Sequence, residues 1–254
     1  MVSAILQAKD VTMRFGGLTA VENFNLSINS DELVGLIGPN GAGKTTIFNV
    51  LTGVYKPSEG EILLEDTLIN GLMPHEVVAL GMSRTFQNIR LFKDLTTIQN
   101  VEIAYNNDIH YQLPHALFRT KKYWEEEEKA YEECKKLLDI FDMGDYEMTK
   151  AKNLPYGQQR KLEIARALAS KPKVLLLDEP AAGMNPKETS ELMETIHFIR
   201  KKFNLAILLI EHDMKMVMGI CERLIVLDYG KTIAAGTPED IRKNPDVIRA
   251  YLGE

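Results

Sequence analysis

The chain has 254 residues, of which 45% are hydrophobic and 26% are charged, and its net charge is −6. This length fits one large or two small domains, and the composition excludes intrinsic disorder. The acidic balance argues against general nucleic-acid binding, which needs a basic surface.

The sequence predicts a cytoplasmic protein without a membrane span. Cys134 and Cys221 lie far apart and outside any Cys/His cluster, so we expect neither a disulfide framework nor a zinc site, and a reducing compartment fits. Residues 1–10 lack the basic and apolar stretches of a signal peptide. The longest apolar run, 205–210, has six residues, whereas a spanning helix needs about 20.

Short strands and helices alternate toward both ends of the chain. In the first part, strands are predicted over 5–15, 23–28 and 33–37, followed by a helix over 45–51. In the last part, strands are predicted over 174–177, 206–210 and 224–227, with helices over 185–204 and 213–220. Continuous apolar strands are typical of parallel sheets that helices cover on both faces. The order therefore predicts an α/β fold with a central, largely parallel sheet.

The middle of the chain, from about 90 to 169, has a mostly helical pattern. Its most charged stretch, 123–141, contains four consecutive glutamates and reads as a solvated helix face. Residues 105–120 include Pro114 and an Asn-Asn-Asp run, which predict an irregular insertion between helices.

These patterns suggest a single domain, 1–254, with an inserted part. We predict an α/β core made of 1–88 and 171–254. A helical subdomain of about 89–170 is inserted into that core.

The segment Gly38-Pro39-Asn40-Gly41-Ala42-Gly43-Lys44-Thr45 matches the phosphate-loop pattern G-x-x-x-x-G-K-[ST]. It follows a predicted buried strand and precedes a predicted helix, so its N–H groups can point inward around an anion. Lys44 would reach the β- and γ-phosphates, and Thr45 offers a hydroxyl to Mg²⁺. We include Thr46, in the same helical turn, in the nucleotide site. An ordinary glycine-rich turn is the alternative, and the strand-loop-helix context disfavours it.

Two carboxylates follow the apolar strand 174–177. Asp178 is placed to hold Mg²⁺ through water, and Glu179 is placed to orient or deprotonate an attacking water. Acidic residues at strand ends are common, so this pair indicates a catalytic site only because the chain also contains a phosphate loop. Together the two motifs predict hydrolysis of a phosphoanhydride.

The segment Leu154-Pro155-Tyr156-Gly157-Gln158-Gln159-Arg160 resembles the L-S-G-G-Q signature of the nucleotide-binding subunits of ATP-binding cassette (ABC) transporters. The resemblance runs essentially from end to end. It implies a P-loop NTPase core with a mostly parallel central sheet, an N-terminal antiparallel β subdomain and an inserted α-helical signature subdomain. It also implies ATP as ligand, ADP as product and head-to-tail pairing of two cassettes. Tyr156, Gly157 and Gln158 would then contact ATP held by the partner chain.

The resemblance assigns further roles. Phe15 is similar to the aromatic residue that stacks on adenine, Gln87 to the glutamine that senses Mg²⁺, and His212 to the switch histidine that contacts the γ-phosphate. Residues 183–186 correspond to the D-loop, which crosses the dimer interface. The residues expected to act in catalysis are Glu179, His212, Gln87 and Lys44. The residues expected to hold Mg²⁺ are Thr45, Gln87 and Asp178.

Three residues depart from the usual family pattern. Pro155 stands where serine is usual, Asn185 where aspartate is usual, and Phe15 where tyrosine is usual. The strings at 84–87, 154–160, 179–186 and 210–214 are nevertheless similar to the ATPases of branched-chain amino acid importers. Of the two ATPases of that system, the chain resembles the larger, because of its insertion around 105–122.

The resemblance implies a motor subunit that hydrolyses ATP on the cytoplasmic face of a membrane. Its implied partners are a second homologous ATPase, identical or not, and permease subunits contacted near 87–92. An extracytoplasmic amino-acid-binding protein would act indirectly, and no nucleic acid is implied.

Several other functions stay open at this point. The cargo could be urea or an exported lipid instead of leucine, isoleucine and valine. A soluble ABC ATPase of DNA repair or translation usually has long coiled-coil insertions or two cassettes, which this chain lacks. A cassette without hydrolysis would be expected to lack Glu179 or His212, and both are present.

Overall fold

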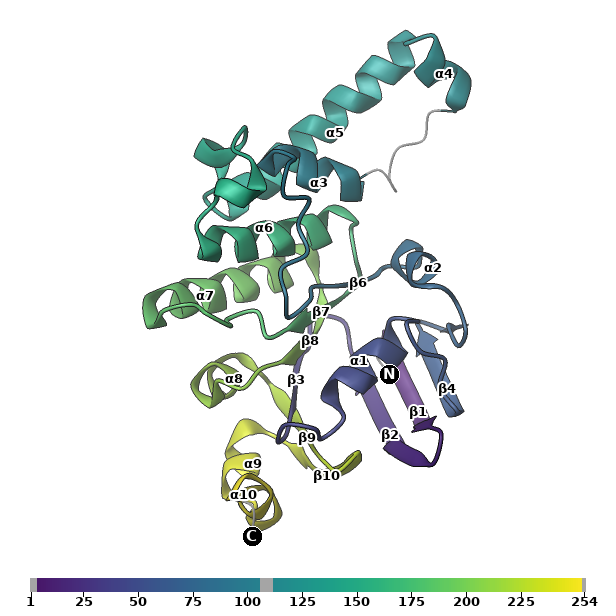
Figure 1. The fold of residues 1–254 in the computed structure, drawn as a ribbon, viewed down its shortest axis with the longest axis vertical. Coiled ribbons are helices and arrows are strands. Elements are labelled where there is room, and N and C mark those ends of the chain that lie inside the picture. The colour runs from purple at the N-terminus through teal and green to yellow at the C-terminus, as the bar shows by residue number, and fades with distance from the viewer. Residues whose placement is uncertain (1–3, 106–111, 253–254) are drawn as a thin grey trace.

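The computed structural model describes residues 4–105 and 112–252 and has two sheets at its centre (Figure 1). One sheet has the order β10-β9-β3-β8-β7-β6, built from β3 (Leu33–Ile37), β6 (Met82–Arg84), β7 (Val174–Asp178), β8 (Ala206–Ile210), β9 (Arg223–Asp228) and β10 (Lys231–Gly236). Its strands pair in parallel except β10, which is antiparallel to β9. The other sheet is antiparallel with the order β2-β1-β4-β5, built from β1 (Leu6–Phe15), β2 (Leu18–Ile28), β4 (Glu59–Leu64) and β5 (Thr67–Leu68).

The larger sheet has apolar strands because both of its faces are covered. Successive residues of a strand point to opposite faces. Leu33 and Ile37 therefore pack with the helices on one face, whereas Val34 and Leu36 pack with the small sheet and α1 (Lys44–Leu51) on the other. All four side chains are fully buried. This arrangement confirms the prediction of a central, mostly parallel sheet from continuous apolar runs.

The helices near the large sheet are α1, α2 (Pro74–Ala79), α7 (Pro186–Phe203), α8 (Met214–Ile220), α9 (Pro238–Lys243) and α10 (Pro245–Leu252). Of these, α1, α7 and α8 were predicted, and each begins within one residue of its predicted start, whereas α2, α9 and α10 were not predicted. The predicted ranges for α7 and α8 include their caps. The side chain of Asn185 accepts hydrogen bonds from the N–H groups of Lys187 and Glu188, and Asp213 caps α8 in the same way. Such caps stabilise helix starts by about 0.5–2 kcal/mol.

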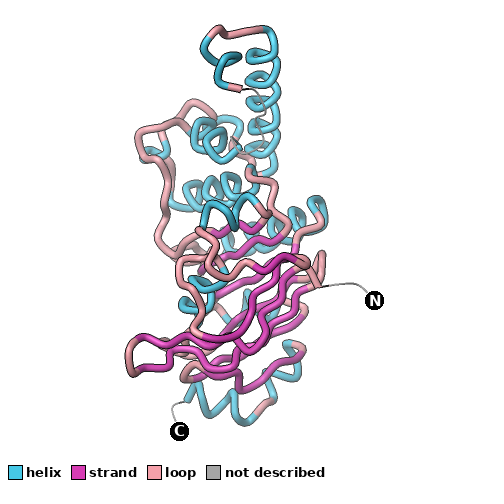
Figure 2. The backbone as a smooth tube through the Cα atoms, turned by 90° about the vertical axis from the view of Figure 1, so that its right-hand side faces the viewer, coloured by secondary structure: helices cyan, strands magenta, loops and turns pink. Residues whose placement is uncertain are grey.

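A helical block separates β6 from β7 in the sequence. It contains α3 (Thr97–Tyr105), α4 (Leu113–Leu117), α5 (Lys121–Ile140) and α6 (Tyr156–Ala169). Figures 1 and 2 show that α5 projects from the body and carries α4 at its far end. The expectation of an irregular segment over 105–120 was wrong for 113–117, which is helical, and residues 106–111 lie outside the described part. We propose that this block is the helical subdomain of about 89–170.

The two cysteines are structural. Cys134 of α5 and Cys221, which follows α8, are both buried free thiols, and burial raises the pKa of each to about 12. Cys221 packs so closely on β3 that a Cβ added at Gly35 would lie 2.9 Å from its Sγ. Within residues 4–105 and 112–252, no helix is long and apolar enough to cross a bilayer.

Candidate functional site

The phosphate loop, residues 38–45, joins β3 to α1 as predicted. Two glycines allow its close approaches to neighbouring backbone. Gly38 has φ 147°, and a Cβ added there would lie 2.1 Å from the carbonyl oxygen of Leu227. Gly43 has φ 104°, and a Cβ added there would lie 2.8 Å from the carbonyl oxygen of Ala20. No side chain caps α1, so the N–H groups of its first turn stay open to an anion.

Lys44 lies over this loop with its ammonium group held by the loop itself. Its Nζ donates to the carbonyl oxygens of Gly38, at 2.7 Å, and Pro39, at 2.9 Å. Burial lowers the pKa of Lys44, and the carboxylates of Glu179 and Asp178 oppose that change. The ammonium group is thus placed between the loop and the two carboxylates, where a phosphate chain would enter.

A cleft of about 380 Å³ opens beside the loop. Its lining residues come from β2, the phosphate loop and the segments that follow β6, β7 and β8: Leu18, Ala20, Asn40, Gly41, Ala42, Gly43, Lys44, Thr45, Thr46, Gln87, Glu179 and His212. The fold thus brings together Lys44, Gln87, Glu179 and His212, which the sequence analysis predicted from four separate motifs.

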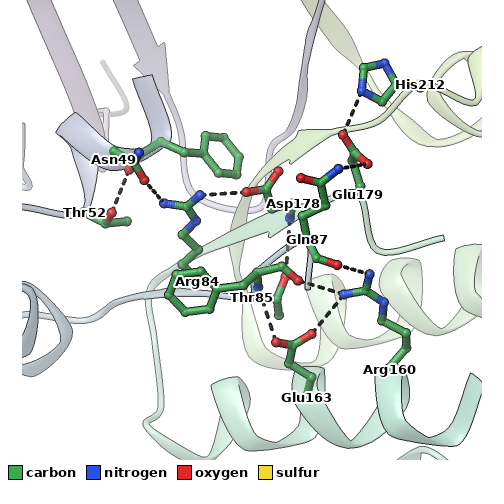
Figure 3. Close-up of polar contacts among 12 residues, drawn as sticks. Asn49, Thr52, Arg84, Thr85, Gln87, Arg160, Glu163, Asp178, Glu179 and His212 are labelled. Carbon is green, nitrogen blue, oxygen red and sulfur yellow. Dashed lines mark hydrogen bonds and ion pairs between the residues drawn. The ribbon is translucent and has the colours of Figure 1, made fainter. Parts of the chain in front are cut away.

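Glu179 is the meeting point of three of these motifs (Figure 3). Nε2 of Gln87 donates to its Oε2 at 2.8 Å, and Nε2 of His212 lies 2.7 Å from its Oε1. Its own backbone has φ 49°, the left-handed region that costs energy for a residue with a Cβ. A hydrogen bond of 2.8 Å from its N–H to the carbonyl oxygen of Ile210 holds this conformation against β8.

Glu211 supports the same corner and was not predicted. Its buried carboxylate accepts hydrogen bonds from the backbone N–H groups of Ala181, at 2.8 Å, and His212, at 2.9 Å. Burial raises the pKa of Glu211. It therefore ties the segment after β7 to the segment after β8. Its position directly before His212, at the end of an apolar strand, was the only signal in the sequence.

The residues predicted to hold Mg²⁺ offer suitable oxygen atoms. Thr45 and Gln87 line the cleft, and the buried Asp178 accepts a hydrogen bond from Arg84 at only one of its carboxylate oxygens. No group of three or more His, Cys, Asp or Glu residues that could hold a metal occurs in the described part of the chain. Mg²⁺ usually needs only one or two carboxylates when a nucleotide supplies further oxygens, so this set fits it.

Phe15 lies at the end of β1 and stands apart from the lining of the cleft. Its side chain is 41% exposed and packs edge-on against Tyr55, with 5.2 Å between the ring centres. Stacking on adenine stays a prediction for this residue.

The signature turn, residues 154–158, opens α6; Pro155 and Tyr156 are exposed, Gly157 and Gln158 are half-buried, and Leu154 is buried. Pro155 is the N-cap, and no side chain caps the helix. Tyr156 is 47% exposed and packs against the D-loop, where a Cβ added at Gly183 would lie 2.9 Å from its ring. Tyr156, Gly157 and Gln158 do not line the cleft of their own chain. The partial exposure of this turn is compatible with the predicted contact to a partner's nucleotide.

A buried ion pair, which the sequence analysis missed, connects α6 to the segment of Gln87. Arg160 and Glu163 are both 2% exposed, and Nη1 of Arg160 lies 3.2 Å from Oε2 of Glu163. Arg160 also donates to the carbonyl oxygens of Phe86 and Gln87 (Figure 3). Glu163 accepts from the N–H groups of Phe86 and Arg90, and burial raises its pKa. Two opposite charges three residues apart in an otherwise apolar helix face were the available signal.

An α/β sheet with a phosphate loop, two strand-end carboxylates and a second open helix start defines a P-loop nucleotide hydrolase. The comparisons specify the class. Residues 21–182 match the family model described as ABC transporter, and residues 231–254 match the one described as branched-chain amino acid ATP-binding cassette transporter. The chain is 49% identical over 254 residues, all of both chains, to the high-affinity branched-chain amino acid transport ATP-binding protein LivG of Escherichia coli (strain K12).

Solved structures agree with this result. The ADP conformation of MJ1267, an ATP-binding cassette of an ABC transporter, matches with a TM-score of 0.85 and 30% identity over 99% of each chain. The dimeric structure of MJ0796, a bacterial ABC transporter cassette, matches with a TM-score of 0.78 and 25% identity over 92% of this chain and 98% of that one. The chain belongs to the ATP-binding cassette family of ABC transporters, and it is an ATPase. The predicted family and fold class are confirmed.

Proposed function

We propose that this chain is the ATP-hydrolysing motor subunit of an importer for leucine, isoleucine and valine. The observation that supports this cargo most directly is the identity of 49% to LivG along the whole chain. The match of residues 231–254 to the branched-chain family model supports it separately, because it lies outside the general ABC match at 21–182. The ATPase does not touch the amino acid, so this part of the proposal rests on relatedness.

In this proposal, the phosphate loop and Lys44 bind the β- and γ-phosphates of ATP. Thr45, Gln87 and Asp178 hold Mg²⁺, which would neutralise part of the charge of the phosphates. Lys44 exchanges its two carbonyl partners, Gly38 and Pro39, for phosphate oxygens. Phe15 stacks on the adenine from the end of β1.

Glu179 performs the proton chemistry. Its carboxylate orients the attacking water and accepts a proton from it. Gln87 and His212 hold the two carboxylate oxygens in the cleft before the reaction. His212 then contacts the γ-phosphate. The same imidazole therefore interacts both with the γ-phosphate and with the general base, Glu179.

Two cassettes close around ATP so that residues 154–158 of one chain meet the phosphate loop of the other. The partner is a second homologous ATPase, identical or not, and the D-loop, residues 183–186, lies at the seam. Closure moves the helical block, and the segment 87–92 passes this movement to permease subunits on the cytoplasmic side of the membrane. The dimeric structure of the MJ0796 cassette supports the pairing of two cassettes.

The test is purification of the complete complex and an ATPase assay in proteoliposomes with its extracytoplasmic binding protein. We expect leucine, isoleucine and valine, delivered by that protein, to stimulate hydrolysis. Stimulation by urea or by a lipid instead would overturn the cargo, and purification without any permease would overturn the role in transport. The control is the empty binding protein, and its effect on the rate of ATP hydrolysis is compared with that of the leucine-loaded protein.

A further inference from the structure

Arg84 is the last residue of β6 and has an unusual environment for a charged side chain. The side chain is only 6% exposed, and its Nη2 lies 2.7 Å from Oδ2 of Asp178 (Figure 3). Its Nη1 donates to Oδ1 of Asn49, in α1, at 2.7 Å. The guanidinium carbon also lies 5.2 Å from the ring centre of Phe48 and 5.0 Å from that of Phe86. The side chain is therefore fixed from four sides.

This contact leaves the two oxygens of Asp178 in different situations. Oδ2 is taken by Arg84, whereas Oδ1 accepts no hydrogen bond from any residue in the described part of the chain. A buried carboxylate without a partner is costly. Arg84 is a suitable partner because its planar guanidinium binds at a defined angle and stays charged. The carboxylate cannot rotate without losing this bond.

We propose that Arg84 is a positioning residue for the metal site. It holds Oδ2 of Asp178 so that Oδ1 is presented to the Mg²⁺ of the bound nucleotide. This inference rests on the role of Asp178 proposed above. Asn49 anchors Arg84 to the helix that follows the phosphate loop. The carboxylate of Asp178 therefore keeps a fixed position relative to the phosphate loop.

The position of Arg84 in the chain adds a second link. Gln87, the other predicted metal residue from this region, follows three residues later. The ring of Phe86, between them, packs on the guanidinium of Arg84. Arg84 therefore supports both sides of the metal site, from β6 and from β7.

The test compares the effect of Mg²⁺ on nucleotide affinity in two variants. Arg84→Met removes the guanidinium and keeps an apolar side chain between Phe48 and Phe86. We measure Kd for ADP by calorimetry in Mg²⁺ and in EDTA, and Mn²⁺ bound with ADP by electron paramagnetic resonance. We expect the affinity for the metal to fall by about 10–100-fold, the usual effect of losing a residue that orients a metal ligand. Affinity for ADP in EDTA should stay at the wild-type value.

The matched control is Arg200→Met. Arg200 is also 6% exposed at its side chain and forms an ion pair, at 2.8 Å, with the exposed carboxylate of Glu222, away from the cleft. Both variants should lower the melting temperature, but only Arg84→Met should reduce the gain in affinity from Mg²⁺. Arg84→Lys, which keeps one charge beside Asp178, should restore part of that gain. If Arg84→Met does not fold, Asn49→Ala provides the same comparison, and its loss of the Mg²⁺-dependent gain in nucleotide affinity should be smaller.

The outcomes separate this inference from the proposed function. An unchanged gain from Mg²⁺ in Arg84→Met, with a reduced gain in Asp178→Asn, would overturn the role of Arg84 alone. An unchanged gain in Asp178→Asn would instead overturn the metal role of Asp178. Equal losses in Arg84→Met and Arg200→Met would assign both effects to stability, against the inference.

Discussion

At Lys44 the ammonium group donates hydrogen bonds to two carbonyl oxygens of its own loop. Lys44→Ala removes a charged donor that we expect to contact the phosphates of ATP. The loss should be about 1.5–3 kcal/mol, which corresponds to roughly 10–150-fold weaker binding. Fluorescence titration with a labelled ATP analogue measures it. The nearby surface variant Lys56→Ala serves as control, and equal affinities of both variants would contradict the placement of Lys44.

Glu179→Gln keeps the size of the side chain but removes the charge and the base. We expect ATP binding to persist and turnover to fall by about 10²–10⁴-fold, the usual contribution of a general base. Because ATP is then not consumed, the variant should accumulate as a nucleotide-bound dimer on light scattering. Glu194→Gln, on the exposed face of α7, is the matched control. Hydrolysis close to the wild-type rate would remove Glu179 from this role.

Three of the predicted site residues share one property. Lys44, Glu179 and His212 each follow an apolar strand or a glycine-rich loop directly, so local pattern places them at the end of the sheet. Arg84 and Glu211 are different, because each has a partner that lies far away in the sequence: Arg84 pairs with the side chain of Asp178, and Glu211 accepts from the backbone N–H of Ala181. The sequence around either residue does not identify its distant partner.

At the scale of elements, Arg160 of α6 joins the signature helix to the backbone of Phe86 and Gln87. Arg160→Met should cost about 3–5 kcal/mol, because Glu163 is then left buried without its partner. Urea denaturation measures this cost. The double variant Arg160→Met/Glu163→Leu should recover much of the stability, since it removes both charges.

The same pair predicts a separable effect on coupling. In the reconstituted complex, the double variant should bind ATP normally but lose most of the stimulation by loaded binding protein, because α6 no longer holds the segment of Gln87. Lys243→Met, which breaks an exposed pair with Glu239, is the control and should change stability by less than about 1 kcal/mol. Full stimulation in the double variant would show that the pair only stabilises the fold.

The long apolar strands and the capped helices were more predictable than the short elements. The strands over 174–177 and 206–210 and the helices after them were found, because apolar runs and caps such as Asn185 and Asp213 mark them locally. The short helix α4 was missed because five residues with a proline near the start carry too little periodic pattern. β6 has only three residues and gives no alternation to read.

At the scale of the whole molecule, the surface position of Gly157 predicts its part in dimer closure. In the background of Glu179→Gln, Gly157→Asp places a negative charge at the start of α6, where a partner's phosphate should bind. We expect ATP binding to persist and the ATP-dependent dimer to disappear on light scattering.

Gly144→Asp is the matched control for that variant. At Gly157 an added Cβ would lie 3.1 Å from Oε1 of Glu188, and at Gly144 it would lie 3.2 Å from Oδ1 of Asp139, so both sites crowd a carboxylate equally. Gly144→Asp should keep the dimer. A stable dimer in Gly157→Asp would contradict the head-to-tail arrangement.

The strand order of the large sheet also bears on how the protein is made. β3, which carries the phosphate loop, pairs with β8 and β9, whose residues lie more than 160 positions later in the chain. During synthesis from the N-terminus, the loop that should bind ATP therefore leaves the ribosome long before the strands that support it on both sides. Nascent chains that stop before β8 should not retain nucleotide, so ATP binding reports that translation and folding have proceeded through β8 and β9.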